Sequence, residues 1–499
     1  MTAPDAPDVI VVGGGTSGCV LAARLSEDPS RSVLLIEEGP DDADYDRTVT
    51  SPAYAQTVSR QQKFAEGLRL DVDDAKVSLA RGRVLGGTSA VNYMATVRGR
   101  PGDYDGWAAR GNPGWSWNDV LPAFRRAEHD LDFPGSSLHG DSGPLTVRRW
   151  SDATFAPAHA AFQHGLTEVG VPAVADLNDV GQLPGVGPFP ASVEPVSGAR
   201  LTVSRAYLDA EVRGRPNLRI RTGARIARIQ VDGRRATGVV TGDGEVLTAG
   251  EIVVSCGAVQ SPALLLRSGI GPAADLRAAG VEPVSDLPGV GRNLQDHLGP
   301  ALLYRVRGDG AGKGGPAQTV WADPNIHVFP VLLPTEDGTA DTKTFAVLVF
   351  SLRPENTGSV MLRPNQPDRR PLIRLPHPGA REIEAQQQAF DVLAAWENST
   401  VAKEVSLFRI GDTGSLARPG AAAAASRSGL ASYAHLTGSC AMGPDSDRLA
   451  VLDTACRVRG IEGLRVVDAS SMPTIPAGNT YLTCVMMAER VAEMMGGGV

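Results

Sequence analysis

The apolar positions near the N-terminus predict a strand, a helix and a second strand. Val9–Val12 is an unbroken apolar run, and a second run, Val33–Ile36, ends at Glu37. Continuous aliphatic runs of this length are typical of parallel strands that are buried on both faces. The segment Gly13-Gly-Gly-Thr-Ser-Gly18 opens the helical stretch between them. The order therefore indicates a βαβ unit with a glycine turn.

The spacing of these glycines is typical of a dinucleotide-binding turn. Gly13 permits a tight turn, Gly15 lets the backbone approach a pyrophosphate, and Gly18 lets the helix pack closely on the strand. The helix N-terminus then faces the phosphates, and Glu37 stands where a carboxylate binds a ribose hydroxyl. The alternative is an ordinary βαβ turn in which Glu37 is a solvated strand end. The turn alone does not separate FAD from NAD.

The middle of the chain predicts further strands, from alternating or continuous apolar positions. These strands are Leu218–Thr222, Arg225–Val231, Val239–Thr241, Glu245–Thr248 and Glu251–Ser255. The short third and fourth segments suggest a small antiparallel meander. The last segment is expected to be a buried strand.

Beyond residue 300 the pattern changes to strands separated by proline-rich turns, which predicts an antiparallel sheet in a second layer. The expected strands are Leu302–Val306, Ile326–Leu333, Thr344–Leu352 and Gly358–Leu362. A helix over Glu382–Asn398 and a strand over Leu464–Val467 follow. The final helix is expected over Thr480–Met495, where apolar positions recur on one face.

Together these elements predict a mixed α/β protein with a Rossmann-like nucleotide domain built from discontinuous segments. Residues 1–150, 200–300 and 425–499 are expected to form that domain. Residues 151–199 and 301–424 are expected to form a substrate-binding domain, in which helices cover the antiparallel sheet.

Composition and charge mainly exclude classes of protein and of site. The chain has 499 residues, and its formal net charge of -8 with scattered basic residues argues against a nucleic-acid partner. It has no apolar stretch of about 18 residues, so we expect no membrane span. No basic leader precedes the first strand and the five cysteines are widely spread, so we expect free thiols and a cytoplasmic protein. No CxxC or HExxH spacing is present, and no metal site is expected.

Four further motifs resemble one family of flavoenzymes, and they run in order through nearly the whole chain. They are Gly82-Arg-Val-Leu-Gly-Gly-Thr-Ser-Ala-Val-Asn92, Gly257-Ala-Val-Gln-Ser-Pro-Ala-Leu-Leu-Leu-Arg-Ser-Gly-Ile-Gly271, Leu287-Pro-Gly-Val-Gly-Arg-Asn-Leu-Gln-Asp-His297, and a C-terminal set of His435-Leu-Thr-Gly-Ser-Cys-Ala-Met-Gly443, Val467-Asp-Ala-Ser470 and Pro476-Ala-Gly-Asn479-Thr480. On these motifs the chain resembles the glucose-methanol-choline (GMC) oxidoreductases, which are FAD-dependent alcohol oxidases and dehydrogenases. The resemblance implies that the cofactor is FAD.

The resemblance also implies where the cofactor and the substrate meet. His435 would act as general base on the substrate hydroxyl, and Asn479 would hold its oxygen while a hydride passes to flavin N5. Asp468 and Ala469 would contact the phosphate and ribityl parts, although Asp468 also suits a turn cap and Asn479 a helix N-cap. His297 is expected to be structural. The residues expected along FAD are Gly13, Gly15, Thr16, Ser17, Gly18, Glu37, Arg83, Gly87, Thr88, Asn92, Ile226, Asp468, Ala469, Asn479 and Thr480.

Departures from the family pattern bear on the flavin link and on the substrate. Val91 stands where some members carry a histidine bonded to the flavin, so we expect non-covalent FAD. Thr96 replaces a usual aromatic residue, Thr483 replaces a frequent proline, and residues 54–77 lack the tryptophan that the family often has in a lid. These changes leave the redox machinery intact and affect the substrate pocket.

The expected function is oxidation of an alcohol to the aldehyde or ketone, with a primary hydroxyl on a small or medium polar metabolite as substrate. Oxygen or another electron acceptor would reoxidise the flavin. One alternative is a FAD-containing enzyme of the hydroxynitrile-lyase type, which has no net redox change. The other is a nicotinamide dehydrogenase or a non-catalytic nucleotide-binding protein.

Overall fold

A five-stranded parallel sheet lies beside the two ends of the chain. The computed structural model describes residues 6–45, 49, 51, 63–307, 317–334, 340–412 and 414–497. The strand order is β24-β13-β1-β2-β9, and each neighbouring pair is parallel. The strands are β1 (Val9–Val12), β2 (Val33–Ile36), β9 (Leu218–Arg221), β13 (Glu251–Val254) and β24 (Leu464–Val466). The prediction of a Rossmann-like sheet assembled from discontinuous segments is confirmed.

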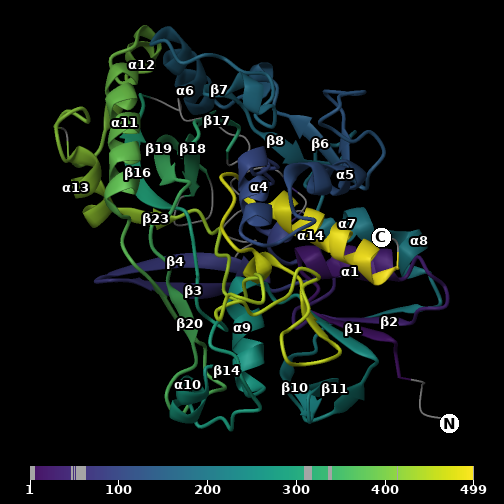
Figure 1. The fold of residues 1–499 in the computed structure, drawn as a ribbon. Coiled ribbons are helices and arrows are strands. Elements are labelled where there is room, and N and C mark those ends of the chain that lie inside the picture. The colour runs from purple at the N-terminus through teal and green to yellow at the C-terminus, as the bar shows by residue number, and fades with distance from the viewer. Residues whose placement is uncertain are drawn as a thin grey trace.

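Helices from both ends of the chain pack together on this sheet. Figure 1 shows α1 (Thr16–Leu25) in purple beside α14 (Thr480–Met495) in yellow, and the two are in direct contact. α14 spans the predicted range, and Met487, Ala488 and Val491 on its predicted apolar face are buried. The other helices in this part of the chain are α4 (Pro101–Ala109), α5 (Trp117–Ala127), α7 (Val203–Tyr207), α8 (Ala210–Arg213), α9 (Gly257–Arg267) and α10 (Ala273–Ala278). No helix in the described part of the chain has the length and apolar character that crossing a membrane requires.

Smaller sheets flank the parallel sheet. The predicted antiparallel meander is confirmed as β10 (Ile226–Asp232), β11 (Arg235–Thr241) and β12 (Val246–Thr248). β11 begins at Arg235 rather than at the predicted Val239. The residues directly before Val239 show no apolar alternation, but they pair with β10 and so extend the strand. The remaining short strands are β5 (Glu128–Asp130), β6 (Leu145–Arg149) and β8 (Pro190–Ser192) in one sheet, and β14 (Ile270–Gly271) and β15 (Ser285–Asp286) in another.

A larger antiparallel sheet has its own apolar core. Its order is β22-β16-β19-β18-β17-β7, and β23 also pairs with β16. The strands are β7 (Gly185–Pro188), β16 (Leu298–Arg305), β17 (Thr319–Ala322), β18 (Ile326–Pro334), β19 (Ala340–Ser351), β22 (Phe408–Arg409) and β23 (Leu430–Ser432). Figure 1 shows the helices that cover it, which are α6 (Pro157–Glu168), α11 (Ala380–Trp396), α12 (Thr400–Glu404) and α13 (Ala421–Ser428). The predicted helix-covered antiparallel sheet is therefore present.

The predicted strand Gly358–Leu362 lies in a different sheet, which corrects the expectation that it joins the larger one. The observed order is β20-β21-β3-β4, formed by β20 (Ser359–Met361), β21 (Leu372–Leu375), β3 (Ala65–Val72) and β4 (Ala75–Gly82). Apolar alternation predicts a strand but not its partner, because pairing depends on segments that are distant in sequence. This sheet takes strands from both expected domains, whose ranges stay a prediction. Residues 54–62 of the expected lid region lie outside the described residues.

The glycine turn yields a prediction about stability. A Cβ at Gly18 would lie 1.9 Å from the carbonyl oxygen of Gly13, so Gly18→Ala forces α1 away from β1. We expect a loss of about 1–3 kcal/mol in the free energy of unfolding, measured by urea titration. The matched control is Gly106→Ala in α4, where a Cβ would meet nothing within 4 Å. That substitution is expected to be neutral or to stabilise by up to about 1 kcal/mol. Equal midpoints for both variants would contradict the packing argument.

Candidate active site

A cavity of about 690 Å³ runs from the parallel sheet to the antiparallel sheet. Its walls include the residues that follow β1, β2, β13 and β24, and side chains from β18 and β19. The carboxyl ends of parallel strands are the usual ligand side of such sheets. The volume is in the range of sites that enclose small molecules and cofactors.

Two glycine turns meet at one end of this cavity. Gly13 has a φ of +100°, and a Cβ on Gly87 would lie only 2.7 Å from the Cα of Gly15. Side chains at these positions would close the space between the turns. α1 begins directly after Gly15, has no side-chain N-cap hydrogen bond and carries no acidic residue in its first turn. Its free N–H groups and positive end suit a phosphate.

Glu37 lines the cavity and is buried, so it is not a solvated strand end. Its carboxylate accepts hydrogen bonds from the backbone N–H groups of Gly14, at 2.8 Å, and Gly39, at 2.9 Å. Burial raises the pKa of Glu37 to about 7, although both hydrogen bonds oppose the rise. The side chain is therefore held rigidly at the wall, and the carboxylate oxygens keep further lone pairs for a ligand.

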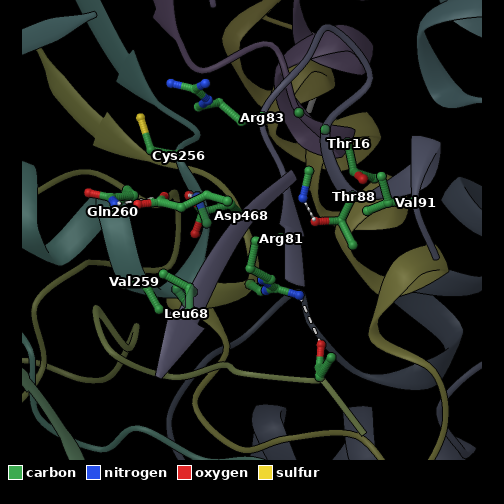
Figure 2. Close-up of a pocket in the computed structure, with 18 of the residues that line it drawn as sticks. Thr16, Leu68, Arg81, Arg83, Thr88, Val91, Cys256, Val259, Gln260 and Asp468 are labelled. Carbon is green, nitrogen blue, oxygen red and sulfur yellow. Dashed lines mark hydrogen bonds between the residues drawn. The ribbon is translucent and has the colours of Figure 1, made fainter. Parts of the chain in front are cut away.

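Asp468 closes the opposite side of the same region. Its carboxylate accepts hydrogen bonds from the backbone N–H groups of Gly257, at 2.8 Å, and Ser470, at 2.7 Å. It thus caps the short 3-10 helix Ala469–Ser471, as the turn-cap alternative expected, and it also lines the cavity (Figure 2). The turn cap is therefore observed, and the contact of Asp468 with FAD stays a prediction.

Nearly all the residues expected to contact the cofactor come together around the cavity. The exception is Gly18, which packs against Gly13. Those that line the cavity are Gly13, Gly15, Thr16, Ser17, Glu37, Arg83, Gly87, Thr88, Asn92, Ile226, Asp468, Ala469, Asn479 and Thr480.

The two expected catalytic residues face each other in the cavity wall. Asn479 Nδ2 lies 3.3 Å from His435 Nε2, and both side chains are buried. Asn479 occupies the N-cap position of α14, but its side chain makes no capping hydrogen bond. Its Oδ1 has no hydrogen-bond partner among the described residues. A buried orphan acceptor of this kind is costly unless a ligand satisfies it. Together with the bare glycine turns, it makes this chain's residues fit a bound dinucleotide and substrate.

His297 lies against His435 rather than apart from it. The two Nδ1 atoms are 3.0 Å apart, and the backbone N–H groups of both residues donate to Asp296 Oδ1, at 2.9 and 2.8 Å. The hydroxyl of Ser432 donates to the other carboxylate oxygen of Asp296. Burial raises the pKa of Asp296 to about 6, and these hydrogen bonds oppose it. The segment Gln295-Asp-His297 was visible in the sequence, but its contact with His435 was not.

Hydrogen-bond chemistry assigns the protons of the two histidines. The amide group of Asn479 donates, so His435 Nε2 must accept, and the proton of His435 then lies on Nδ1 and points to His297 Nδ1. Burial lowers the pKa of both imidazoles well below the usual value. Both rings are therefore neutral at pH 7, and His435 presents a lone pair at Nε2.

Arg81 is a site residue that the sequence interpretation missed. It lines the cavity, and its Nη1 donates to the carbonyl oxygen of Ala434 at 2.9 Å, marked by a dashed line in Figure 2. Ala434 has a left-handed φ of +61°, a strained conformation for a residue with a side chain. Arg81 thus fixes the backbone directly before His435. The available signal was its position immediately before the motif that starts at Gly82.

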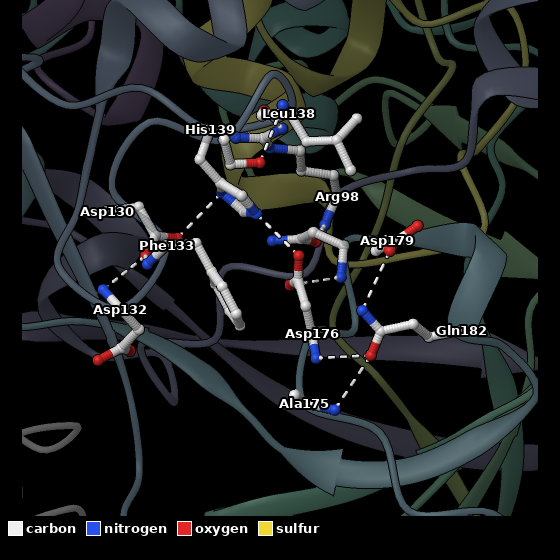
Figure 3. Close-up of polar contacts among 12 residues, drawn as sticks. Arg98, Asp130, Asp132, Phe133, Leu138, His139, Ala175, Asp176, Asp179 and Gln182 are labelled. Carbon is white, nitrogen blue, oxygen red and sulfur yellow. Dashed lines mark hydrogen bonds and ion pairs between the residues drawn. The ribbon is translucent and has the colours of Figure 1, made fainter.

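A buried charged cluster outside the cavity has the donor set of a metal site. Figure 3 shows its centre at His139, whose Nδ1 lies 2.9 Å from both Glu128 Oε2 and Asp130 Oδ2 and whose Nε2 lies 2.8 Å from Asp176 Oδ2. Arg98 pairs with Glu128, and Arg149 pairs with Asp130 and Asp176; these arginines complete the cluster.

The protonation of His139 balances the charges of this cluster. Burial alone would lower its pKa, but the hydrogen bonds to Asp130, Asp176 and Glu128 outweigh it and raise the pKa to about 10. An imidazolium has no lone pair for a metal. The three carboxylates are balanced by this imidazolium and the two guanidinium groups. We therefore interpret the cluster as a structural ion network.

The raised pKa of His139 predicts a pH-dependent stability. Its contribution is complete below pH 6.5 and is lost as the pH rises towards 10, because the folded state holds the proton more tightly. We expect His139→Gln to lower the urea midpoint below pH 6.5 and to flatten its decline at high pH. His129→Gln, on β5 between Glu128 and Asp130 but outside the cluster, is the control. A drop in midpoint after dialysis against EDTA would instead support a metal.

Comparison with known proteins identifies the family. Two family profiles described as GMC oxidoreductase match residues 7–299 and 354–488. The chain is 34% identical to 5-(hydroxymethyl)furfural oxidase of Methylovorus sp. (strain MP688), over 97% of this chain and 98% of the relative. It is 34% identical to oxygen-dependent choline dehydrogenase of Vibrio vulnificus (strain YJ016), over 98% and 94%. The crystal structure of pyridoxine 4-oxidase from Mesorbium loti matches with a TM-score of 0.87 and 30% identity, over 98% of this chain and 99% of that one. The chain therefore belongs to the GMC oxidoreductase family and is a FAD-dependent oxidoreductase that acts on CH–OH groups.

Proposed function

We propose that this enzyme oxidises a primary alcohol to the aldehyde, with His435 as the general base. The observation that carries the proposal is the pairing of His435 Nε2 with the Asn479 amide, 3.3 Å apart in the cavity wall. A neutral imidazole with an available lone pair can accept the hydroxyl proton, and such assistance is worth about 10²–10⁴-fold in rate.

In the proposed reaction the side chains around this pair have separate roles. Nε2 of His435 takes the proton of the hydroxyl, and the Asn479 amide donates to the same oxygen and so orients the carbon. The Nδ1–H of His435 donates to His297, which stabilises the positive charge that His435 gains. FAD, when bound, supplies the acceptor for the hydride that leaves the carbon. The low exposure of the site excludes bulk water from the proton transfer.

The residues proposed to hold FAD are those that line the glycine-rich end of the cavity. Gly13, Gly15 and Gly87 leave room for the pyrophosphate at the start of α1, and Glu37 offers a carboxylate to the ribose. Val91 also lines the cavity. An aliphatic side chain cannot bond to the flavin, so the proposed FAD is non-covalent.

The electron acceptor and the compartment belong to the same proposal. Oxygen or another acceptor would reoxidise the flavin. The two relatives described above are an oxidase and an oxygen-dependent dehydrogenase, which favours oxygen as the acceptor. All five cysteines are unpaired, which supports a reducing compartment such as the cytoplasm.

Substitution of the proposed base tests the mechanism. We expect His435→Ala to slow anaerobic flavin reduction by an alcohol by about 10²-fold or more while FAD stays bound. Asn479→Ala is expected to slow it by about 10-fold, because one hydrogen bond to the substrate oxygen is lost. The measurement is the stopped-flow loss of the yellow flavin band. His164→Ala, at an exposed histidine paired with Asp152, is the matched control.

Two outcomes would overturn the proposed mechanism. If His435→Ala reduces the flavin as quickly as the unmodified enzyme, His435 is not the base. If a hydroxynitrile is cleaved while the flavin band persists anaerobically, the enzyme belongs to the lyase class instead.

The link to the flavin has a separate test. We expect acid precipitation of the holoenzyme to release all the yellow colour into the supernatant, because Val91 provides no atom for a covalent bond. The absorbance of pellet and supernatant measures this directly. A yellow pellet would show that another residue forms the bond.

A further inference from the structure

The antiparallel sheet presents a markedly apolar wall to the cavity. Among the described side chains, its strands β18 and β19 contribute Phe329, Leu348 and Phe350 to this wall. Phe189, directly after β7, and Tyr433, directly after β23, extend the same wall. Phe189, Phe329 and Phe350 are each about 1% exposed, so their rings are fixed by the surrounding core.

The rings of this wall form a stacked series that ends at the proposed base. Phe350 stacks on Tyr433 with centroids 4.5 Å apart and an interplanar angle of 17°. Tyr433 in turn stacks on His435, at 4.0 Å and 24°. Phe329 lies tilted against Tyr433 at 5.1 Å. Because Phe350 and His435 cover the two faces of Tyr433, this ring presents its edge to the cavity. The wall beside the reacting position is therefore aromatic, and it favours an aromatic substrate ring through edge-to-face contact.

Charge is absent from this wall. Among the described residues, every charged side chain that lines the cavity comes from the loops of the parallel sheet, the β3–β4 hairpin, α9 or residues 368–370. His327, which hydrogen-bonds to the Tyr433 hydroxyl at 3.3 Å, is kept neutral because burial lowers its pKa to about 3. A carboxylate or ammonium group that lies against this wall would thus be desolvated with no side chain of opposite charge on the wall to pair with it.

Arg81 is the charged side chain that lines the cavity next to the proposed base, whereas the Asp296 carboxylate, which accepts the backbone N–H of His435, does not line the cavity. Arg81 donates to the carbonyl of Ala434, one residue before His435, and it also lowers the pKa of His435. No ion pair between Arg81 and a carboxylate is found within the described part of the chain. A buried cation at this place repels a cationic substrate, which an aromatic wall alone would attract.

From these observations we propose that the substrate is a neutral aromatic primary alcohol. Its ring packs on Phe329, Phe350 and Tyr433, and its hydroxymethyl group lies at His435. The hydroxyl proton passes to His435 Nε2, the carbon loses a hydride with its two electrons to FAD, and an aromatic aldehyde forms. This inference rests on the proposed function and narrows the polar metabolite expected from the sequence to an uncharged aromatic one.

The test compares alcohols of matched size by anaerobic flavin reduction. The probes are benzyl alcohol, its saturated counterpart cyclohexylmethanol, choline as a cation and hydroxymethylbenzoate as an anion. We expect kcat/KM for benzyl alcohol to exceed that of each other probe by about tenfold or more. Faster reduction by cyclohexylmethanol, choline or hydroxymethylbenzoate overturns the proposed class.

Substitutions in the wall identify the cause of the preference. Phe350→Leu and Phe329→Leu are expected to reduce the ratio of kcat/KM for benzyl alcohol to kcat/KM for cyclohexylmethanol by about tenfold, because only the aromatic substrate loses a ring–ring contact. The matched control is Phe345→Leu, which removes a buried ring from β19 at a position that does not line the cavity. FAD absorbance verifies folding, and either wall variant suffices if the other fails to bind FAD. An unchanged ratio in the folded variants overturns the role of the wall.

The same panel separates this inference from the proposed function. If choline or cyclohexylmethanol reduces the flavin fastest and His435→Ala abolishes that reduction, the general base stands and the aromatic class fails. If benzyl alcohol is preferred and His435→Ala leaves its oxidation unchanged, the aromatic class stands and the base assignment fails.

Discussion

The carboxylate of Asp296 is the contact on which the active site depends. It accepts the backbone N–H groups of His297 and His435 and the hydroxyl of Ser432, so it joins two segments that are far apart in the chain. It thereby holds the turn at the left-handed Ala434 together with Arg81, Ser432 and the backbone N–H of Tyr433, which donates to the carbonyl of His297. Because the carboxylate holds both backbones, the two imidazoles meet at Nδ1, and the proposed base directs Nε2 to the cavity.

A second set of contacts brings Asn479 to the same place. The backbone N–H of Asn479 donates to the carbonyl of Val97, and a Cβ on Gly478 would lie 2.1 Å from the carbonyl oxygen of Arg98. Arg98 is itself anchored by Glu128 in the ion network around His139. The network therefore lies behind the segment, residues 97–98, against which α14 begins. Its protonated histidine supports the position of the amide without touching the cavity.

Local patterns predicted the elements of this fold, and distant contacts decided their assembly. The glycine turn and α14 were predictable because each depends on residues within a few turns of one another. The sheet membership of β20 was not, since its neighbours are set by pairing with β21 and β3. The site shows the same division. His435 and Asn479 lie in recognisable motifs, whereas the roles of Arg81 and His297 follow from which side chains the fold brings beside His435.

The surroundings of His435 in the cavity set both the pKa and the orientation of its imidazole. Burial by the aromatic wall and the nearby Arg81 lower the pKa of His435, which keeps its lone pair free at pH 7. The same desolvation makes a protonated His435 costly, so the proton it takes must be stabilised where it forms. The hydrogen bond from His435 Nδ1 to His297 Nδ1 fixes the orientation of the ring and keeps its proton on Nδ1. In the proposed mechanism burial thus keeps the lone pair of His435 Nε2 available, and the histidine pair directs that lone pair to the cavity.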